Sequence, residues 1–338
     1  MTTPTGVLLG VDVGGTKTDA VLVAADGALL ARVIGAGANH ETVGWVEAEA
    51  RIRGVLRELL TGAQVTAAEI TSSAWGFAGL DSPADEARHR RLVVDLGLSR
   101  DSIVVNDAFL ALDVGETTGA GIAIVSGTGA LVVGRHPDGT TARTLGVGAG
   151  RGEWGSGTDI VDAGARAVAE ALLGTGPETG LTEIALRRSG APSVAAYAAE
   201  VWRHGRPHLL PPDVWGLAAR GDAASCRIRD RVADSLSAGA AYAAGQLHLE
   251  DGEIVLAGRV LDPGHPVLHE AMVTALAGVL PGCQVRRLGV APVVGAVLAA
   301  ARLAVWDPEL LSHTRTGLYR DVGRSPRSDG VGDPAPAS

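Results

Sequence analysis

The sequence contains few cysteines, few aromatic residues and no cluster of basic residues. Its two cysteines, Cys226 and Cys283, lie far apart and form no Cys-x-x-Cys pair, so the sequence indicates neither a disulfide framework nor a cysteine-ligated cluster. Acidic residues outnumber basic ones by 38 to 29, which gives a net charge of −9. Because no dense run of Lys or Arg is present, we expect no nucleic-acid partner.

Signals for secretion and membrane insertion are also missing. The first residues carry no basic flank and no small-residue cleavage site of the kind that a signal peptide has. The longest apolar stretches, such as 7–11 and 290–301, are too short or too often broken by Gly and Pro to span a bilayer. We therefore expect a soluble, cytoplasmic protein without a membrane partner.

Glycine and small apolar residues dominate what is present. The 338 residues include 47 glycines, about twice the usual share, and 46% are hydrophobic while 20% are charged. This balance excludes disorder for the bulk of the chain. The length fits two domains, each large enough to bury its own core.

An internal duplication organises the sequence. Residues 6–16 form an apolar strand that runs into a Gly-rich turn, and two further strands follow across an Asp-Gly turn. The same scheme returns in residues 121–145, again with a Gly-Thr turn and an Asp-Gly turn. Asp-Gly turns between strands are common, so two unrelated hairpins are the alternative. The matched Gly-Thr turns favour a duplication.

Strands and helices then alternate in both halves. The apolar spacing in 52–60 predicts an amphipathic helix, and strands are expected over 71–79, 101–107, 253–258 and 283–288. This alternation implies parallel pairings and an α/β fold. A mostly helical insert is expected over about 156–246. The last residues are rich in Gly, Pro and Ser, so we expect a disordered tail over 318–338.

The two Gly-rich turns carry residue types suited to binding phosphate. Asp12 ends the first strand, before the turn residues Gly14, Gly15, Thr16 and Lys17. Glycines allow a phosphate to approach backbone N–H groups, while hydroxyls and an ammonium group donate to it. A carboxylate at this place can hold Mg²⁺, often through water. The alternative is a plain hairpin in which Asp12 caps the turn.

The second turn, Ser126-Gly-Thr-Gly129, strengthens this interpretation. Two such loops that face each other across a cleft would clamp a nucleotide, with Gly127, Thr128 and Gly129 on the second side. The chain has no Walker A loop.

These motifs, together with Asn106-Asp107-Ala108 and the turn at Gly258, resemble in their order the sugar kinase/heat-shock ATPase/actin superfold. More narrowly, the sequence resembles the BadF/BadG-type ATPase family, which includes N-acetylglucosamine kinases. The resemblance implies two duplicated actin-like, ribonuclease H-like domains with mixed sheets flanked by helices and an ATP cleft between them. We expect these domains at 1–117 and 118–317. It also implies ATP and Mg²⁺ as cofactors and a homodimer.

Asp107 is the candidate catalytic residue. The matching Asp in the family is the general base that takes the proton from the sugar hydroxyl as it attacks the γ-phosphate, which agrees with the needs of phosphoryl transfer. The alternative is an Asp that caps the following helix. Asn39 matches a family Asn that contacts the sugar, although it can also satisfy its own loop backbone. We interpret the neighbouring His40 as a packing residue.

Residues 146–156 resemble the sugar-binding loop of the family but depart from its pattern. Gly146 and Ser156 match. Val147 stands where relatives commonly have Trp, Glu153 at the position of a sugar-binding Asp, and Trp154 at that of the following Glu. Glu153 can still accept hydrogen bonds from sugar hydroxyls, and Arg151 can pair with it or bind an acidic group. The alternative is a Gly-rich crossover whose Trp154 is simply buried.

Gly258 resembles the glycine of the family's adenosine turn, where Arg259 replaces a Ser and could stack on adenine or point to solvent. The whole pattern predicts an ATP-dependent kinase of a sugar, foremost an amino sugar such as N-acetylglucosamine or glucosamine. A non-catalytic sugar or nucleotide sensor and an ATPase activator of the same family are the alternatives. The activator would need cysteine ligands that this sequence does not provide.

Overall fold

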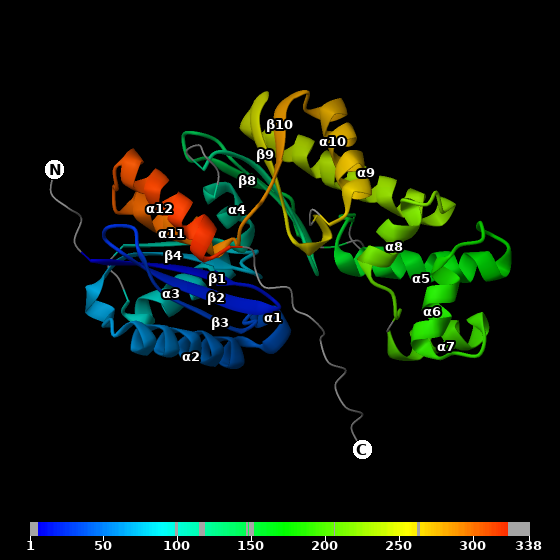
Figure 1. The fold of residues 1–338 in the computed structure, drawn as a ribbon, viewed down its shortest axis with the longest axis horizontal. Helices are drawn as coiled ribbons and strands as arrows, with labels where there is room; N and C mark the ends of the chain where they lie inside the picture. Colours follow the sequence, from blue (N-terminus) through cyan, green and yellow to red (C-terminus); the bar gives the residue numbers. More distant parts are fainter. Residues whose placement is uncertain are drawn as a thin grey trace, which may run out of the picture.

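The computed structural model describes residues 6–98, 101–114, 119–146, 148, 152–205, 207–261 and 264–323. These residues form two lobes, each built around a five-stranded mixed sheet (Figure 1). The α/β architecture predicted from the alternation of strands and helices is therefore confirmed.

The first sheet has the strand order β3-β2-β1-β4-β5. Its first three strands are antiparallel neighbours, and β4 and β5 extend the sheet in parallel with β1. The strands are β1 (Val7–Val13), β2 (Lys17–Ala24), β3 (Leu29–Ala36), β4 (Ile70–Phe77) and β5 (Asp101–Asn106). Because side chains alternate along β1, Leu9 and Val11 pack under helices α2 (Trp45–Ala63) and α3 (Pro83–Leu96), while Leu8 packs on the opposite face.

The second sheet repeats this topology, with the order β10-β9-β6-β7-β8. Its strands are β6 (Gly121–Ser126), β7 (Ala130–Arg135), β8 (Thr141–Arg143), β9 (Asp251–Ala257) and β10 (Gly282–Arg287). The long helix α9 (Ala223–Leu247) packs on β7 as α2 packs on β2, and α10 (Pro266–Val279) joins β9 to β10 as α3 joins β4 to β5. The duplication expected from the two Gly-Thr turns is confirmed.

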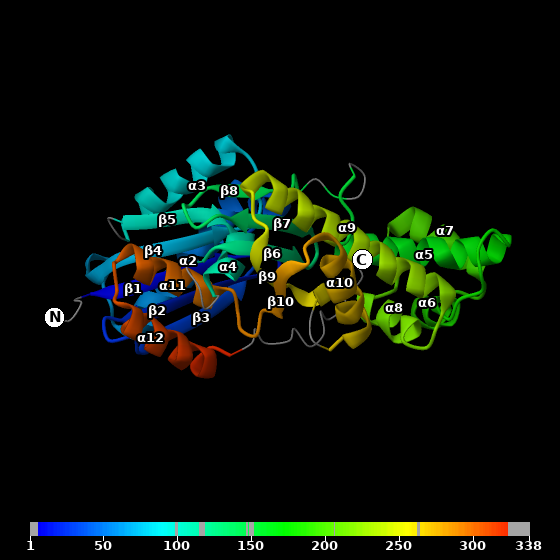
Figure 2. The same ribbon diagram turned by 90° about the horizontal axis from the view of Figure 1, so that it is seen from above.

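The helix that follows the last strand of each half crosses to the other half. Helix α4 (Leu110–Asp113), together with the 3₁₀ turn η2 (Asp107–Phe109), packs on β6 and β7 of the second sheet. Helix α11 (Val293–Leu303) packs on β1 and β4 of the first sheet, and α12 (Pro308–Asp321) lies beside it (Figures 1 and 2).

This exchange differs from the expected domain boundaries. The sequence analysis placed residues up to 317 in the second domain, but the hydrophobic core formed by α11 and α12 belongs to the first sheet. The expected tail also begins too early, because α12 continues to Asp321 and Val322 is buried. An apolar helix that leaves one sheet and covers another cannot be assigned to either half from its own pattern. Residues 324–338 lie outside the described residues.

The expected helical insert lies at the far end of the second half. Its first four helices are α5 (Gly157–Leu173), α6 (Leu181–Ser189), α7 (Val194–His204) and α8 (Pro211–Ala218), which lie away from the first sheet in both views (Figures 1 and 2). The expected range up to 246 is too long for an insert, because it includes most of α9, which covers the second sheet. The short elements are α1 (His40–Val43), η1 (Ala67–Glu69) and η4 (Arg259–Leu261). Among the described helices, none is both long and apolar enough to cross a membrane.

Two glycines allow α11 to sit this close to its neighbours. A Cβ atom on Gly10 of β1 would lie 2.7 Å from the Val297 side chain, and one on Gly295 of α11 would lie 2.0 Å from the Leu110 carbonyl oxygen. The second clash is with backbone, so it cannot be relieved by a rotamer change.

Gly295→Ala is therefore expected to lower the free energy of unfolding by about 1–3 kcal/mol. Gly278→Ala is the matched control, because this glycine of α10 has open space around its Cβ position. The control should leave stability unchanged or raise it by up to roughly 1 kcal/mol, as alanine favours a helix. Urea denaturation of both variants tests this, and equal stabilities would contradict the close packing described.

Candidate active site

Two carboxylates meet at the carboxyl edge of the first sheet. Asp12 lies in the last part of β1 and Asp107 directly follows β5, with β4 between these parallel strands. Burial raises the pKa of Asp12 to about 6. Burial, followed by the negative charges of Asp12 and Asp81, raises the pKa of Asp107 to about 7. Asp107 therefore holds or releases a proton near neutral pH, as a general base must.

Gly76 on the intervening strand makes room for Asp107. A Cβ atom at this position would lie 3.0 Å from the Asp107 Cα and closer still to the Leu110 side chain. The sequence analysis did not single out Gly76. The only signal in the sequence was the glycine itself, because a glycine within a predicted strand often marks a place where another segment approaches closely.

The first Gly-rich turn projects from the same edge. The Gly14 N–H donates to the Lys17 carbonyl at 2.9 Å, and Gly15 and Thr16 are exposed at the tip. The residues that follow β3 pack against it, because the Ala38 N–H donates to the Gly14 carbonyl and a Cβ on Gly37 would meet the Gly15 oxygen at 2.2 Å. Gly14 and Gly15 are thus held by the segment after β3, while Gly15 and Thr16 stay accessible to a ligand.

Lys17 forms an ion pair at the base of the first turn. It is the only lysine in the chain, and its Nζ lies 2.6 Å from Oδ2 of the fully buried Asp19. Arg32 also binds Asp19, with Nε to Oδ1 at 2.9 Å and Nη2 to Oδ2 at 2.8 Å. Burial works against ionisation of Asp19, but these cations outweigh it and lower its pKa. The Lys17 ammonium is therefore tied to Asp19, although its charge also lowers the pKa of Asp12.

The second turn abuts the start of α5. The Gly157 N–H donates to the Gly127 carbonyl at 2.7 Å, and the Thr158 hydroxyl donates to the Thr128 carbonyl at 3.1 Å. Ser156 caps the helix through a capping box with Asp159. Thr128 and Gly129 are exposed beside this helix start, where backbone N–H groups and the helix dipole favour an anion.

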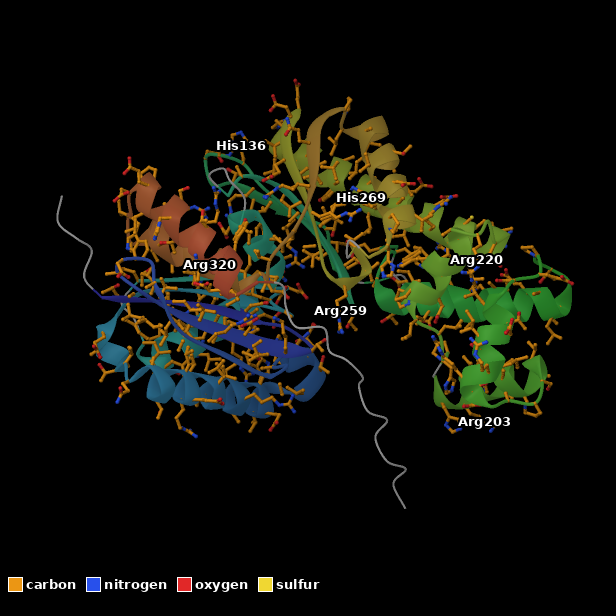
Figure 3. The ribbon with its side chains drawn as sticks, viewed as in Figure 1. His136, Arg203, Arg220, Arg259, His269 and Arg320 are labelled. Carbon is orange, nitrogen blue, oxygen red and sulfur yellow. The ribbon has the colours of Figure 1, made fainter. Side chains whose placement is uncertain are left out.

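Gly258 and Arg259 connect the two turns. Gly258 has a φ of +92°, and a Cβ there would lie 2.1 Å from the Ser126 carbonyl oxygen, so only glycine fits against the second turn. Arg259 lies on the side of the second half that faces the first (Figure 3). Its Nη2 lies 3.4 Å from the Thr16 hydroxyl oxygen. The guanidinium thus reaches the first turn from the second half.

Asn39 is the N-cap residue of α1. Its Oδ1 accepts a hydrogen bond from the Glu41 N–H at 2.9 Å, which leaves the amide group as the donor it can offer. His40 stacks on Trp45 with ring centroids 4.0 Å apart and lies edge-on to His89. His40 therefore packs, as interpreted from the sequence.

Residues 146–156 are described only in part. Val147 and Arg151 lie outside the described residues, so their expected roles stay predictions. Glu153 Oε1 accepts a hydrogen bond from the Leu145 N–H at 2.5 Å, which closes the loop on itself. Trp154 is buried beneath Arg231, whose guanidinium carbon lies 4.4 Å from the ring centroid. Trp154 is therefore a packing residue, which was the alternative interpretation.

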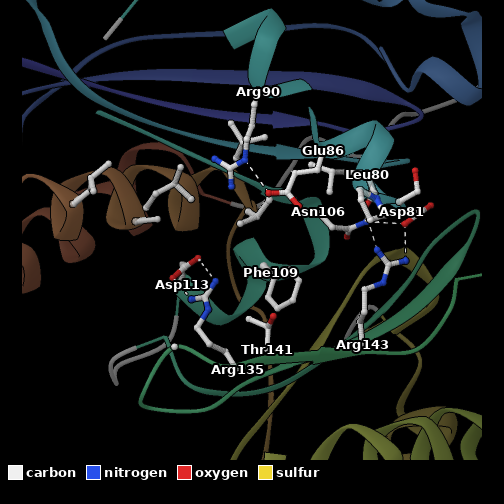
Figure 4. Close-up of a pocket in the computed structure, with 18 of the residues that line it drawn as sticks. Leu80, Asp81, Glu86, Arg90, Asn106, Phe109, Asp113, Arg135, Thr141 and Arg143 are labelled. Carbon is white, nitrogen blue, oxygen red and sulfur yellow. Dashed lines mark hydrogen bonds and ion pairs between the residues drawn. The ribbon is translucent and has the colours of Figure 1, made fainter. Parts of the chain in front are cut away.

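Asp81 and Arg143 were missed by the sequence analysis. Arg143 ends β8 in the second half, and its Nη2 lies 2.6 Å from Asp81 Oδ1 in the first half. Both line one end of a cavity of about 730 Å³ between the halves (Figure 4). Asp12, Asn39 and Asp107 do not line this cavity. Nothing in a single sequence pairs residues 62 positions apart, so no signal was available.

Asp12 and Asp107 fit a magnesium ion as a donor set. Hard oxygen ligands suit Mg²⁺, which keeps much of its water shell and needs only one or two carboxylates. The negative charge of Asp12 also raises the pKa of Asp107, and a cation beside the two groups would relieve that repulsion. Among the described residues, no group of three or more His, Cys, Asp or Glu forms a cage for a metal.

Curated relatives match part of the chain. An N-acetyl-D-glucosamine kinase of Dictyostelium discoideum is 33% identical over 192 residues, which cover 54% of this chain and 60% of the relative. An N-acetylmuramic acid/N-acetylglucosamine kinase of Clostridium acetobutylicum is 32% identical over 165 residues, 49% of this chain and 53% of the relative. The chain thus spans little more than half the length of these relatives.

Solved structures share the fold across most of the chain. A candidate N-acetylglucosamine kinase of Chromobacterium violaceum superposes with a TM-score of 0.63 at 20% identity, covering 89% of this chain and 99% of its own. A ROK family glucokinase of Streptomyces griseus, solved with glucose and AMPPNP, gives 0.56 at 19% identity over 88% of this chain and 99% of its own. The model of the BadF/BadG/BcrA/BcrD ATPase family matches residues 9–300. The chain belongs to the BadF/BadG/BcrA/BcrD ATPase family.

Proposed function

We propose that this protein transfers the γ-phosphoryl group of ATP to a hydroxyl group of a sugar, foremost an amino sugar such as N-acetylglucosamine or glucosamine. The observation that carries the proposal is the pair of Asp12, which is buried, and Asp107, which is partly exposed, at the same sheet edge as the first of two Gly-rich turns. The two partial relatives named as N-acetylglucosamine kinases support this choice of acceptor.

Asp107 acts as the general base. Phosphoryl transfer demands little covalent chemistry from the protein, so positioning and one proton acceptor beside the nucleophile suffice. With a pKa of about 7, the Asp107 carboxylate is basic enough to take the proton of the attacking hydroxyl and is still largely ionised above neutral pH.

The two turns bind the phosphates of ATP. Gly14, Gly15 and Thr16 offer backbone N–H groups and a hydroxyl from one side, and Gly127, Thr128 and Gly129 offer theirs from the other. Gly258 allows the nucleotide to lie against the backbone. Lys17 adds its ammonium group to the first turn, and Arg259 supplies a second cation that reaches this turn from the second half.

Asp12 would hold Mg²⁺, directly or through water, with Asp107 nearby. When bound, Mg²⁺ neutralises phosphate charge during transfer. Asn39, Gly146 and Glu153 surround the acceptor, with Asn39 donating through its amide group and Glu153 accepting through its carboxylate. Closure of the halves over the substrates would exclude water and so limit ATP hydrolysis.

Asp107→Asn tests the proposal. The amide cannot accept the proton, so we expect kcat for sugar-dependent ADP release to fall by on the order of 10²–10⁴ while the Kd for MgATP stays within about threefold. Asp95→Asn, an exposed change on α3, is the control and should keep wild-type rates. An unchanged kcat in a folded Asp107→Asn protein would remove Asp107 from this role.

The same substitution should stabilise the protein. The folded-state pKa of about 7 lies above the ordinary 3.8, so ionised Asp107 destabilises the fold above pH 7, and this penalty shrinks as pH falls toward 4. Asp107→Asn is expected to raise the free energy of unfolding by about 1–3 kcal/mol at pH 8 and by less at pH 5. Urea denaturation without metal or nucleotide measures this. A gain of equal size at both pH values would show that ionisation is not its cause.

Arg259→Ser tests the phosphate contact. Loss of one charge-assisted hydrogen bond should raise the KM for MgATP about tenfold and leave the sugar KM within about twofold. Arg203→Ser on α7, far from the cleft in Figure 3, is the matched control. A larger effect on the sugar KM than on the MgATP KM would place Arg259 on the acceptor side instead.

A further inference from the structure

The guanidinium group of Arg143 contacts both halves of the molecule at once. Toward the first half, Nη1 donates to the Leu80 carbonyl at 3.0 Å and Nη2 donates to Asp81 Oδ1 at 2.6 Å. Toward its own half, Nη2 donates to the Leu145 carbonyl at 3.2 Å and Nε donates to the Thr144 carbonyl at 3.1 Å. Arg143 is therefore a bridge across the cleft (Figure 4).

On the first half, this bridge ends beside Asp107. Asn106 Nδ2 donates to Asp81 Oδ1 at 3.2 Å, and Asn106 Oδ1 accepts from the Ala108 N–H at 3.0 Å. Asn106 and Ala108 are the two neighbours of Asp107 in the chain. Asp81 thus holds the backbone that carries the base, and its charge acts on the Asp107 carboxyl group.

On the second half, the bridge ends at the proposed acceptor-binding loop. The Leu145 carbonyl accepts from Arg143, while the Leu145 N–H donates to Glu153. Gly146 follows with a φ of +74°, and a Cβ on it would lie 3.2 Å from Arg143 Nη2. The loop therefore leaves β8 directly against the guanidinium group.

We propose that Arg143 is a positioning residue that fixes the distance between the acceptor-binding loop and Asp107. The base belongs to one half and the loop to the other, so their separation depends on how the halves lie relative to each other. A misplacement of about 1 Å can reduce a transfer rate by about 10²-fold. This inference rests on the proposed kinase function, because it assigns an acceptor to the loop.

Arginine is suited to this task and lysine is not. Its planar fork presents five N–H donors in fixed directions, which allows one side chain to hold four oxygen atoms on two segments. A lysine ammonium would keep the charge opposite Asp81 but could not reproduce the contacts to Leu80, Thr144 and Leu145 together. Arg143→Lys therefore separates the role of geometry from that of charge.

The matched control is Arg90, which lines the same cavity (Figure 4). Its Nε donates to Glu86 Oε1 at 2.8 Å within helix α3, so this ion pair stays inside the first half. Arg90→Met removes an arginine from the cavity without removing a bridge and should leave kcat within about twofold of wild type.

The experiment measures ADP and sugar phosphate separately, with N-acetylglucosamine or glucosamine as acceptor and MgATP saturating. For Arg143→Met and Arg143→Lys we expect kcat to fall on the order of 10²-fold and more than one ADP to form per sugar phosphate, since water competes when the hydroxyl is misaligned. The Kd of a fluorescent ATP analogue should stay within about threefold. Asp81→Asn should lower kcat in the same direction, and adding Arg143→Met to it should cost little more, as expected of one shared contact.

The outcomes are distinct. If the wild-type protein forms no sugar phosphate, the proposed function fails and the role of Arg143 fails with it. If the wild type is active and folded Arg143→Met and Arg143→Lys match it in kcat and in the ratio of ADP to sugar phosphate, the positioning role alone is refuted. The role would also be refuted if kcat fell in the Arg143 variants while the ratio of ADP to sugar phosphate stayed at one, and kcat fell equally in Arg90→Met. The effect would then be a general structural one.

Discussion

The proximity of the Asp12 and Asp107 carboxyl groups is the constraint on which the rest of the site depends. Burial raises both pKa values, and the negative charge of Asp12 raises that of Asp107 further, so the fold holds two carboxyl groups in surroundings that oppose their ionisation. Such strain persists only where the surrounding structure fixes the groups in place. The parallel strands β1, β4 and β5 do this, because their carboxyl ends lie at one edge of the sheet and Gly76 allows close approach.

The duplicated topology supplies the second half of the site. Each sheet presents a Gly-rich turn after its first strand, and each half sends its last helix to the other sheet. The crossing helices α4 and α11 contact each other where Gly295 packs against Leu110. Two arginines also connect the halves, Arg143 through Asp81 and Arg259 through Thr16 of the first turn.

The fold was largely predictable from the sequence because its signals are local. Apolar strands, Gly-Thr turns and alternating elements repeat at matching places, and these indicated the duplication. The positions of Asp12 and of the Gly-rich turns follow from such patterns. Other contacts could not be predicted in this way, because the ion pair of Lys17 with Asp19, the bridge of Arg143 to Asp81 and the crossing of α11 depend on tertiary packing. The sequence allowed Trp154 to belong to the sugar-binding loop or to the core, and its burial decides for the core.

The central claim is that the paired carboxylates serve phosphoryl transfer to a sugar. Its most direct test is to incubate the protein with MgATP and, in turn, N-acetylglucosamine, glucosamine, N-acetylmannosamine, glucose and an acidic sugar, and to quantify ADP and phosphorylated sugar by mass spectrometry. We predict that at least one amino sugar yields its phosphate in equal amount to ADP. Intact ATP binding with no phosphorylated sugar from any of them would contradict the account and favour a sensor.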